Sequence, residues 1–198
     1  LDNWKTPALC DGMEEVTMYI QRFYTDKVAK TYKPVKIKDF GEYSLYDTGV
    51  TTTGYPIVKC SKADETVKIV YAENINEDFT LNFTSAGYEH QIANDEFITD
   101  GINQYYQPYL LWHGFRYFTL TNNAVPVEVL EIYTGAPVTS SFECSDETVN
   151  WLYNTYVHTQ LCNTHSAVVT DCPHRERLGY TGDGQLCAKA GMLIADLK

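Results

Sequence analysis

The sequence has few basic residues and no long apolar run. Its 198 residues include 15 Lys and Arg against 26 Asp and Glu, which gives a formal net charge of −11. Nucleic-acid binding requires a basic patch that can face phosphates, and none is visible, so this class of partner is not expected. No apolar run is long enough to cross a bilayer, so we expect no membrane insertion either.

The sequence also lacks a Cys-X-X-Cys pair. Its six cysteines are irregularly spaced and lie at Cys10, Cys60, Cys144, Cys162, Cys172 and Cys187. Because 44% of the residues are hydrophobic, the chain can bury a core, and this spacing favours free thiols over a disulfide framework. Free thiols favour a cytoplasmic location and leave a secreted or periplasmic location open.

Three further features are absent from the sequence. No Gly-X-Ser-X-Gly elbow is present, and Cys172 has only His165 or His174 as a base partner, so a nucleophile-based hydrolase is not favoured. No repeat or low-complexity segment occurs. The chain starts without Met and without a signal-peptide pattern, so we expect a piece of a longer protein.

The first two thirds of the chain have the pattern of β structure. Short apolar or aromatic runs alternate with Gly, Asn and Asp turns, which favours a sandwich over βαβ units. The expected strands cover residues 17–23, 55–59, 66–71, 79–83, 115–120 and 127–133. The sixteen tyrosines prefer strands for packing reasons, so we assign none of those in this part to a ligand site.

The pattern changes after Gly135-Ala136-Pro137, which predicts one domain over residues 1–137 and another over 138–198. Ser145 is the expected N-cap of a helix, and apolar residues recur after it at helical spacing as far as Leu161. A second helix is expected over about residues 184–197, capped by Thr181 or Asp183. Two helices cannot bury such apolar faces alone.

The segment between these helices is the densest in reactive groups. Residues 171–183 read Asp-Cys-Pro-His-Arg-Glu-Arg-Leu-Gly-Tyr-Thr-Gly-Asp. Pro173 disfavours helix at its predecessor and two glycines permit turns, so a shaped loop is expected. If the loop is extended, Glu176 need not face the neighbouring arginines, and its pKa then depends on where Asp171 and Asp183 lie.

Two alternatives accompany this interpretation of the segment. Arg175 and Arg177 can instead form buried ion pairs with Asp171 and Asp183 that only hold the loop in place. Cys162, His165, Cys172 and His174 offer imidazole and thiolate groups of the kind that bind zinc. Their spacing matches no finger pattern, so we expect neither a metal nor another cofactor.

The motif Asp-Cys-Pro-X-Arg-Glu-Arg-Leu-Gly-aromatic-Thr-Gly-Asp resembles the signature of bacterial α-L-rhamnosidases of glycoside hydrolase family 78. Residues 113–118, His-Gly-Phe-Arg-Tyr-Phe, are similar to a strand of the β-sandwich that precedes the catalytic domain in that family. Residues 141–146 resemble the approach to the first catalytic-domain helix. The likeness runs from about residue 43 onward and is strongest over 113–183.

The resemblance implies a role for each residue of the motif. Glu176 would be the general acid that protonates the glycosidic oxygen. Asp171 and Asp183 would bind sugar hydroxyls, and Arg175 would either bind the sugar in the same pocket or support the pocket's other side chains. Tyr180 stands where the family usually has Trp, and its smaller ring changes the pocket that faces the sugar. The two Asp residues could also raise the pKa of Glu176 by like-charge repulsion.

The implied fold is an antiparallel, jelly-roll-like β-sandwich followed by the first helices of an (α/α)6 barrel. The implied reaction is hydrolysis of terminal α-L-rhamnosides with inversion, which needs a second carboxylate as general base. In the family that base lies far downstream, so we expect no useful activity from these residues alone. The alternative is that the β-rich part is a non-catalytic carbohydrate-binding module; the oligomeric state stays open.

Overall fold

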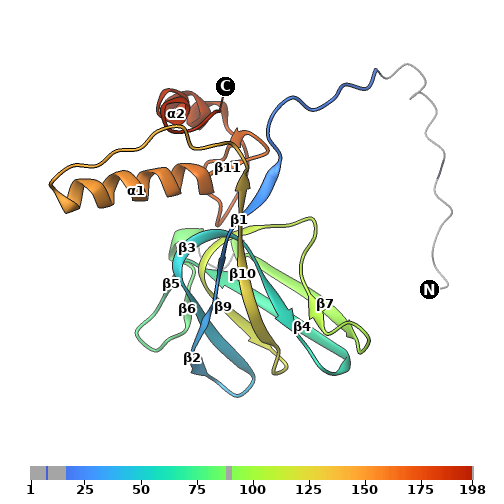
Figure 1. Cartoon of the computed structure of the whole chain (residues 1–198). Helices are drawn as coiled ribbons and strands as arrows, with labels where there is room; N and C mark the ends of the chain where they lie inside the picture. Colours follow the sequence, from blue (N-terminus) through green and yellow to red (C-terminus); the bar gives the residue numbers. More distant parts are fainter. Residues whose placement is uncertain (1–7, 9–16, 88–90, 198) are drawn as a thin grey trace.

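The computed structural model of the chain describes residues 8, 17–87 and 91–197 (Figure 1). Eight strands form one antiparallel sheet, and two helices lie beyond one end of it. The strands of the sheet are β1 (Asp26–Tyr32), β2 (Val35–Asp39), β3 (Tyr43–Lys59), β4 (Ala63–Ala72), β7 (Asn94–Asp100), β8 (Tyr105–Tyr106), β9 (His113–Thr121) and β10 (Val125–Thr134). The other elements are β5 (Asn74–Ile75), β6 (Leu81–Asn82), the 3₁₀ turn η1 (Thr84–Ala86), α1 (Glu147–Cys162), β11 (Thr164–His165), β12 (Val168–Val169) and α2 (Thr181–Ile194).

The sheet curls because β3 is long and bent. The strand order is β1-β10-β3-β9-β4-β7, and β2 and β8 also pair with β3. The pairing of β3 with β9 breaks between Asp47 and Thr52, where Gly49 takes a φ of 87°. Such an irregularity bends a strand and increases its twist. As a result β3 pairs with β2 before the bend and with β10 and β8 after it, which gives a sandwich-like arrangement.

Most of the strand predictions are confirmed. Residues 55–59, 66–71, 115–120 and 127–133 lie in β3, β4, β9 and β10. Residues 17–23 were expected as a strand but form none, and Met18, Tyr19 and Ile20 are exposed because no sheet edge or core covers them.

The prediction for residues 79–83 is correct only at β6. Phe79 has a left-handed φ of 71°, and the Asn76 N–H donates to the Thr80 carbonyl at 2.8 Å. These residues therefore make a turn, which leaves only Leu81 and Asn82 to pair with β5.

The sheet encloses an aromatic and aliphatic core. Phe115 and Phe118 are fully buried and meet edge to face, with ring centroids 5.7 Å apart. Within the described strands of the sheet, the other large apolar side chains that are fully buried are Leu45, Val58, Val67, Ile69, Leu120 and Val129. The buried apolar residues of β4 and β9 belong to the short apolar and aromatic runs that predicted these strands.

Helix α1 begins one residue later than predicted. Asp146, not Ser145, is the N-cap, and its carboxylate accepts from the Thr148 and Val149 N–H groups at 2.8 and 3.3 Å. Only the C-terminal part of the helix packs, since Leu161 is buried while Val149 and Leu152 are exposed. The predicted apolar face is therefore covered at one end only.

Helix α2 begins earlier than predicted. It starts at Thr181, and Tyr180 occupies the N-cap position without a side-chain cap, so neither Thr181 nor Asp183 caps the helix. Asp183 lies in the first turn, where a negative charge is favourable to the helix dipole. Gly182 and Gly184 have helical backbones, and a Cβ added at either residue would meet open space. The expected start of the helix near residue 184 was therefore wrong.

The helices contact the sheet through polar groups as well as apolar ones. Leu161, Ile194 and Ala195 pack against Tyr133 of β10. Beside them, His158 Nε2 lies 2.7 Å from the carboxylate of the fully buried Glu131. Contacts of His158 with Cys162 and Glu131 outweigh its burial and raise its pKa to about 10.

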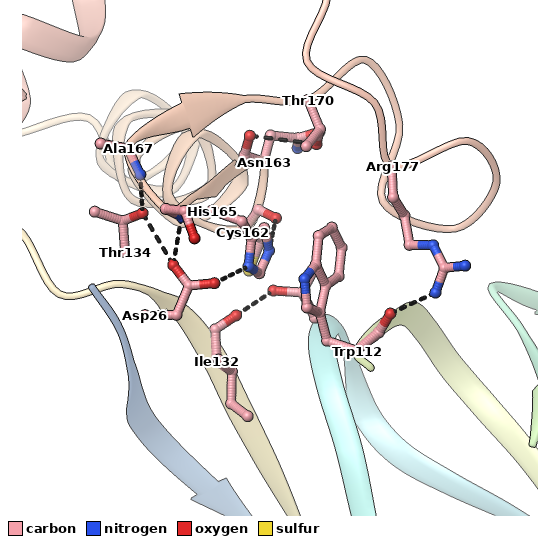
Figure 2. A network of polar contacts seen from close by, with 12 residues as sticks. Asp26, Trp112, Ile132, Thr134, Cys162, Asn163, His165, Ala167, Thr170 and Arg177 are labelled. Carbon is pink, nitrogen blue, oxygen red and sulfur yellow. Dashed lines mark hydrogen bonds and ion pairs between the residues drawn. The ribbon is translucent and has the colours of Figure 1, made fainter. Parts of the chain in front are cut away.

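A second polar contact holds the β11–β12 hairpin against β1 and β10 (Figure 2). Asp26 accepts from the Ser166 N–H at 2.5 Å and the Thr134 hydroxyl at 3.2 Å, and it faces His165 Nδ1 at 3.1 Å. The Ala167 N–H donates to the Thr134 hydroxyl at 2.8 Å. Ser166 and Ala167 have φ values of 49° and 61°, a two-residue turn that normally selects Gly or Asn, so this network offsets a strained backbone.

Two negative findings complete the description. None of the helices in the described residues is long and apolar enough to span a membrane. The five cysteines in the described ranges carry free thiols, and Cys10 lies outside those ranges.

We predict that Asp26→Asn destabilises the chain at neutral pH by about 1–3 kcal/mol, because a partly buried charge-assisted network loses its anion. Burial opposes ionisation of Asp26, but its contacts with His165 and Ser166 are stronger and lower its pKa. A lowered pKa adds stability above the ordinary value of about 4, and that contribution disappears as the pH falls through the depressed pKa. Urea unfolding of both proteins should therefore show a difference at pH 7 that shrinks toward about pH 2.5; an equal difference at both pH values would contradict this.

Candidate active site

The loop that carries the predicted site residues is a turn and not an extended strand. The N–H groups of Arg175 and Arg177 approach the Cys172 carbonyl at 3.4 and 3.2 Å, and Arg177 has a φ of 57°. The Asp171 N–H donates to the Leu178 carbonyl at 3.1 Å, which closes the loop at its base. Because the backbone turns, adjacent side chains can meet, so the expectation of opposite-facing neighbours was wrong.

Four of the five predicted site residues gather on this turn. The Tyr180 hydroxyl donates to Glu176 Oε2 at 2.7 Å, and Arg175 Nη2 lies 3.3 Å from Glu176 Oε1. The same guanidinium reaches Asp171 at 3.9 Å. Asp183 lies apart from them in the first turn of α2, and within the described residues no hydrogen bond or ion pair joins it to the other four.

Glu176 and Tyr180 are accessible. The Glu176 side chain keeps 28% of its surface exposed, and Tyr180 is exposed as well. The hydrogen bond to Glu176 raises the pKa of the Tyr180 hydroxyl, so this group remains a donor at neutral pH. Glu176 is therefore oriented by a neutral donor on one oxygen and by a cation on the other.

Asp171 has one carboxylate oxygen without a partner. The Cys172 thiol donates to Oδ2 at 2.9 Å, whereas Oδ1 is buried and unpaired among the described atoms. Burial opposes ionisation, but the bonds from Cys172 and the charge of Arg175 outweigh it and lower the pKa of Asp171. Asp171 is thus an anion with a free acceptor, which is the chemistry needed to bind a hydroxyl group.

The alternative of buried ion pairs is only partly correct. Arg175 does approach Asp171, but its side chain is about one third exposed. Arg177 contacts no carboxylate in the described part of the chain; its Nη1 donates to the Trp112 carbonyl at 2.7 Å and to His113 Nδ1 at 3.0 Å (Figure 2).

The contact with Arg177 also determines which ring nitrogen of His113 carries the hydrogen. A guanidinium is always a donor, so His113 Nδ1 must accept, and Nε2–H then donates to Asp95 at 3.0 Å. The Tyr71 hydroxyl donates to the other oxygen of Asp95 at 2.8 Å. This buried chain of contacts runs from β4 through β7 and β9 to the loop. The sequence pattern of residues 113–118 marked this strand but not its contact with Arg177.

The loop is fixed to β9 by the backbone too. The Gly114 N–H donates to the Pro173 carbonyl at 2.9 Å. A Cβ added at Gly114 would lie 2.7 Å from Pro173 C and from His174 N, so only glycine permits this approach. Beside this contact, His174 faces the Ser85 carbonyl at 2.9 Å and Glu73 at 3.4 Å.

A pocket of about 620 Å³ opens between the sheet, α1 and this loop. Asp171, Cys172 and His174 line it from the loop, and His158 and Cys162 line it from α1. Glu176 and Asp183 are not among the lining residues of this pocket.

The structure does not bring together the four residues considered for zinc. His165 stacks on Trp112, with ring centroids 3.5 Å apart, and contacts Asp26. The Cys172 thiol donates a hydrogen bond to Asp171, and His174 lies against Ser85 of η1 and against Glu73, which follows β4. Only Cys162 of this set belongs to a group of side chains that could hold a metal.

Two family models match the chain. Residues 38–135 match the bacterial α-L-rhamnosidase concanavalin-like domain, and residues 137–198 match the bacterial α-L-rhamnosidase 6 hairpin glycosidase domain. Together these matches cover the whole sheet from β3 onward and both helices.

Individual proteins give the same result. An α-L-rhamnosidase of Formosa agariphila is 28% identical over 98% of this chain, and one of Streptomyces avermitilis is 31% identical over 79%. The chain spans 22% and 15% of those two proteins.

Solved structures agree with these matches. The α-L-rhamnosidase of Dictyoglumus thermophilum superposes with a TM-score of 0.79 at 30% identity, over 90% of this chain and 21% of that one. The S. avermitilis α-L-rhamnosidase in complex with L-rhamnose has a TM-score of 0.79 at 28% identity, over 89% of this chain and 18% of that one. The chain therefore belongs to the bacterial α-L-rhamnosidase family.

Proposed function

We propose that the protein containing this chain hydrolyses terminal α-L-rhamnosides with inversion, and that Glu176 is its general acid. The observation that carries the proposal is the arrangement of Glu176, Tyr180, Arg175 and Asp171 on one turn, in a chain of the rhamnosidase family. A relative of known structure holds L-rhamnose, which supports a sugar substrate of this kind.

The acid must give its proton to the leaving oxygen, so its carboxyl must be reachable and oriented. Glu176 meets both conditions, since its side chain is 28% exposed and Tyr180 fixes one oxygen. Arg175 Nη2 contacts the other oxygen of Glu176 at 3.3 Å and also reaches Asp171 at 3.9 Å.

The sugar would be held by hydrogen bonds to charged side chains and by contact with an aromatic ring. Oδ1 of Asp171 is free to accept from a hydroxyl, and the exposed Tyr180 ring offers a face to the apolar side of a pyranose. Asp183 and Arg175 would complete the contacts to hydroxyl groups. This assignment needs no metal or organic cofactor.

The general base would come from outside this chain. An inverting pair of carboxyl groups is separated by about 6.5–9.5 Å to leave room for water. The matched relatives are several times longer than the chain, and Val149, Leu152 and Leu193 leave an apolar helix surface exposed. We propose that further helices of an (α/α)6 barrel cover this surface, with the domain boundary at residues 137/138, and that one of them carries the base.

We predict that Glu176→Gln in the full-length enzyme lowers kcat on natural rhamnosides by about 10²–10⁴-fold, because the leaving oxygen loses its proton donor. Binding of rhamnose, measured by isothermal titration calorimetry, should change little. Glu77→Gln alters an exposed Glu outside the site and serves as the matched control. Near-wild-type turnover of a substrate with a poor leaving group would exclude Glu176 as the acid.

We also predict that Gly114→Ala lowers kcat of the full-length enzyme by about 10–100-fold, because the added Cβ pushes on backbone atoms of Pro173 and His174 and displaces the loop. Gly184→Ala is the matched control, since its Cβ would meet open space. Steady-state kinetics on folded variants checks this. If Gly114→Ala turns over as fast as the control, β9 does not position the loop.

A further inference from the structure

Three side chains with metal-binding atoms converge where α1 meets β10. Glu131 comes from β10, and His158 and Cys162 lie one turn apart on the same face of α1. His158 Nε2 is 2.7 Å from Glu131 Oε2 and 3.4 Å from Cys162 Sγ. One ligand atom from each residue lies within 4.8 Å of the other two.

The hydrogen bonds of this cluster are incomplete. Glu131 is 0% exposed, and its Oε2 accepts from the Tyr32 hydroxyl at 2.8 Å and the Thr52 hydroxyl at 2.6 Å, besides facing His158. Its Oε1 is buried and has no partner among the described atoms. A fully buried carboxylate oxygen without a donor is unusual, and a bound cation or a water molecule would satisfy it.

His158 offers only one atom to two neighbours. The same Nε2 faces both the carboxylate and the sulfur, and one N–H cannot be aimed at both. A cation placed between oxygen, nitrogen and sulfur contacts all three at once. To bind the ion, Nε2 of His158 would have to offer a lone pair, so it would bind in the unprotonated form.

The donor set selects the kind of metal. One imidazole, one thiolate and one carboxylate match the tetrahedral ligands of zinc, and two anionic ligands neutralise a divalent ion. Tyr32 and Thr52 would hold the carboxylate in place by their hydrogen bonds. His158 and Cys162 also line the 620 Å³ pocket, so a fourth coordination position would open into this pocket, which Asp171 lines too.

We propose that Glu131, His158 and Cys162 form a binding site for one divalent zinc-type metal ion, with an open coordination position that faces the pocket. The proposal does not depend on the rhamnosidase assignment, because it concerns the contact between sheet and helix and can be tested without substrate.

The test is a titration of the reduced, metal-free full-length protein with Co²⁺, followed by displacement with Zn²⁺. We expect one Co²⁺ per chain, with the charge-transfer absorption of a cobalt–thiolate bond and the intense visible bands of tetrahedral Co²⁺. X-ray absorption of the zinc form should give one sulfur neighbour at about 2.3 Å and oxygen or nitrogen neighbours at about 2.0–2.2 Å.

Variants locate the site. Cys162→Ser should abolish the charge-transfer band, and Thr52→Val, which keeps all three ligands, should weaken affinity by about 10–100-fold. Cys172→Ser is the matched control, because this thiol lines the same pocket but is not in the cluster. No bound metal in the wild-type chain, or no sulfur in the zinc environment, would overturn the proposal without any variant. Loss of the band in Cys172→Ser with retention in Cys162→Ser would also overturn it.

Discussion

The candidate site depends on one contact, that between the turn at residues 172–177 and the start of β9. A hydrogen bond from the Gly114 N–H to the Pro173 carbonyl joins the two backbones, and the Arg177 side chain donates hydrogen bonds to the Trp112 carbonyl and to His113. The sheet side of this contact is rigid, because His113 is buried and held in turn by Asp95. The β-rich part therefore positions the reactive loop that lies far downstream in the sequence.

The helices are attached to the sheet by polar groups at two further points. Asp26 holds the β11–β12 turn, and Glu131 faces His158 of α1. Both carboxylates come from strands, and both partners come from the helical part. Since such contacts have directional geometry, they orient the helices more tightly than the small apolar cluster around Leu161 would alone.

Local sequence patterns predicted strands such as β4 and β9, because their short apolar and aromatic runs supply the buried core. They missed β1 and β2, whose residues are mostly exposed and are fixed by pairing partners distant in the chain. The motif of residues 171–183 predicted four residues that do meet, since a short loop keeps them near one another. Arg177 and Glu131 could not be assigned, because their partners lie 64 and 27 residues away and only the tertiary fold brings them together.

The central claim is that the β9 contact aims the carboxyl of Glu176 at the glycosidic oxygen. The most direct test measures kcat of full-length Arg177→Lys on rhamnosides whose leaving groups range from good to poor, because the lysine side chain ends one bond short of Nη1, the atom that donates to both the Trp112 carbonyl and His113. The account predicts a rate loss that grows as the leaving group becomes poorer, since poor leaving groups need the proton most. An equal loss on all substrates, or none, would contradict it.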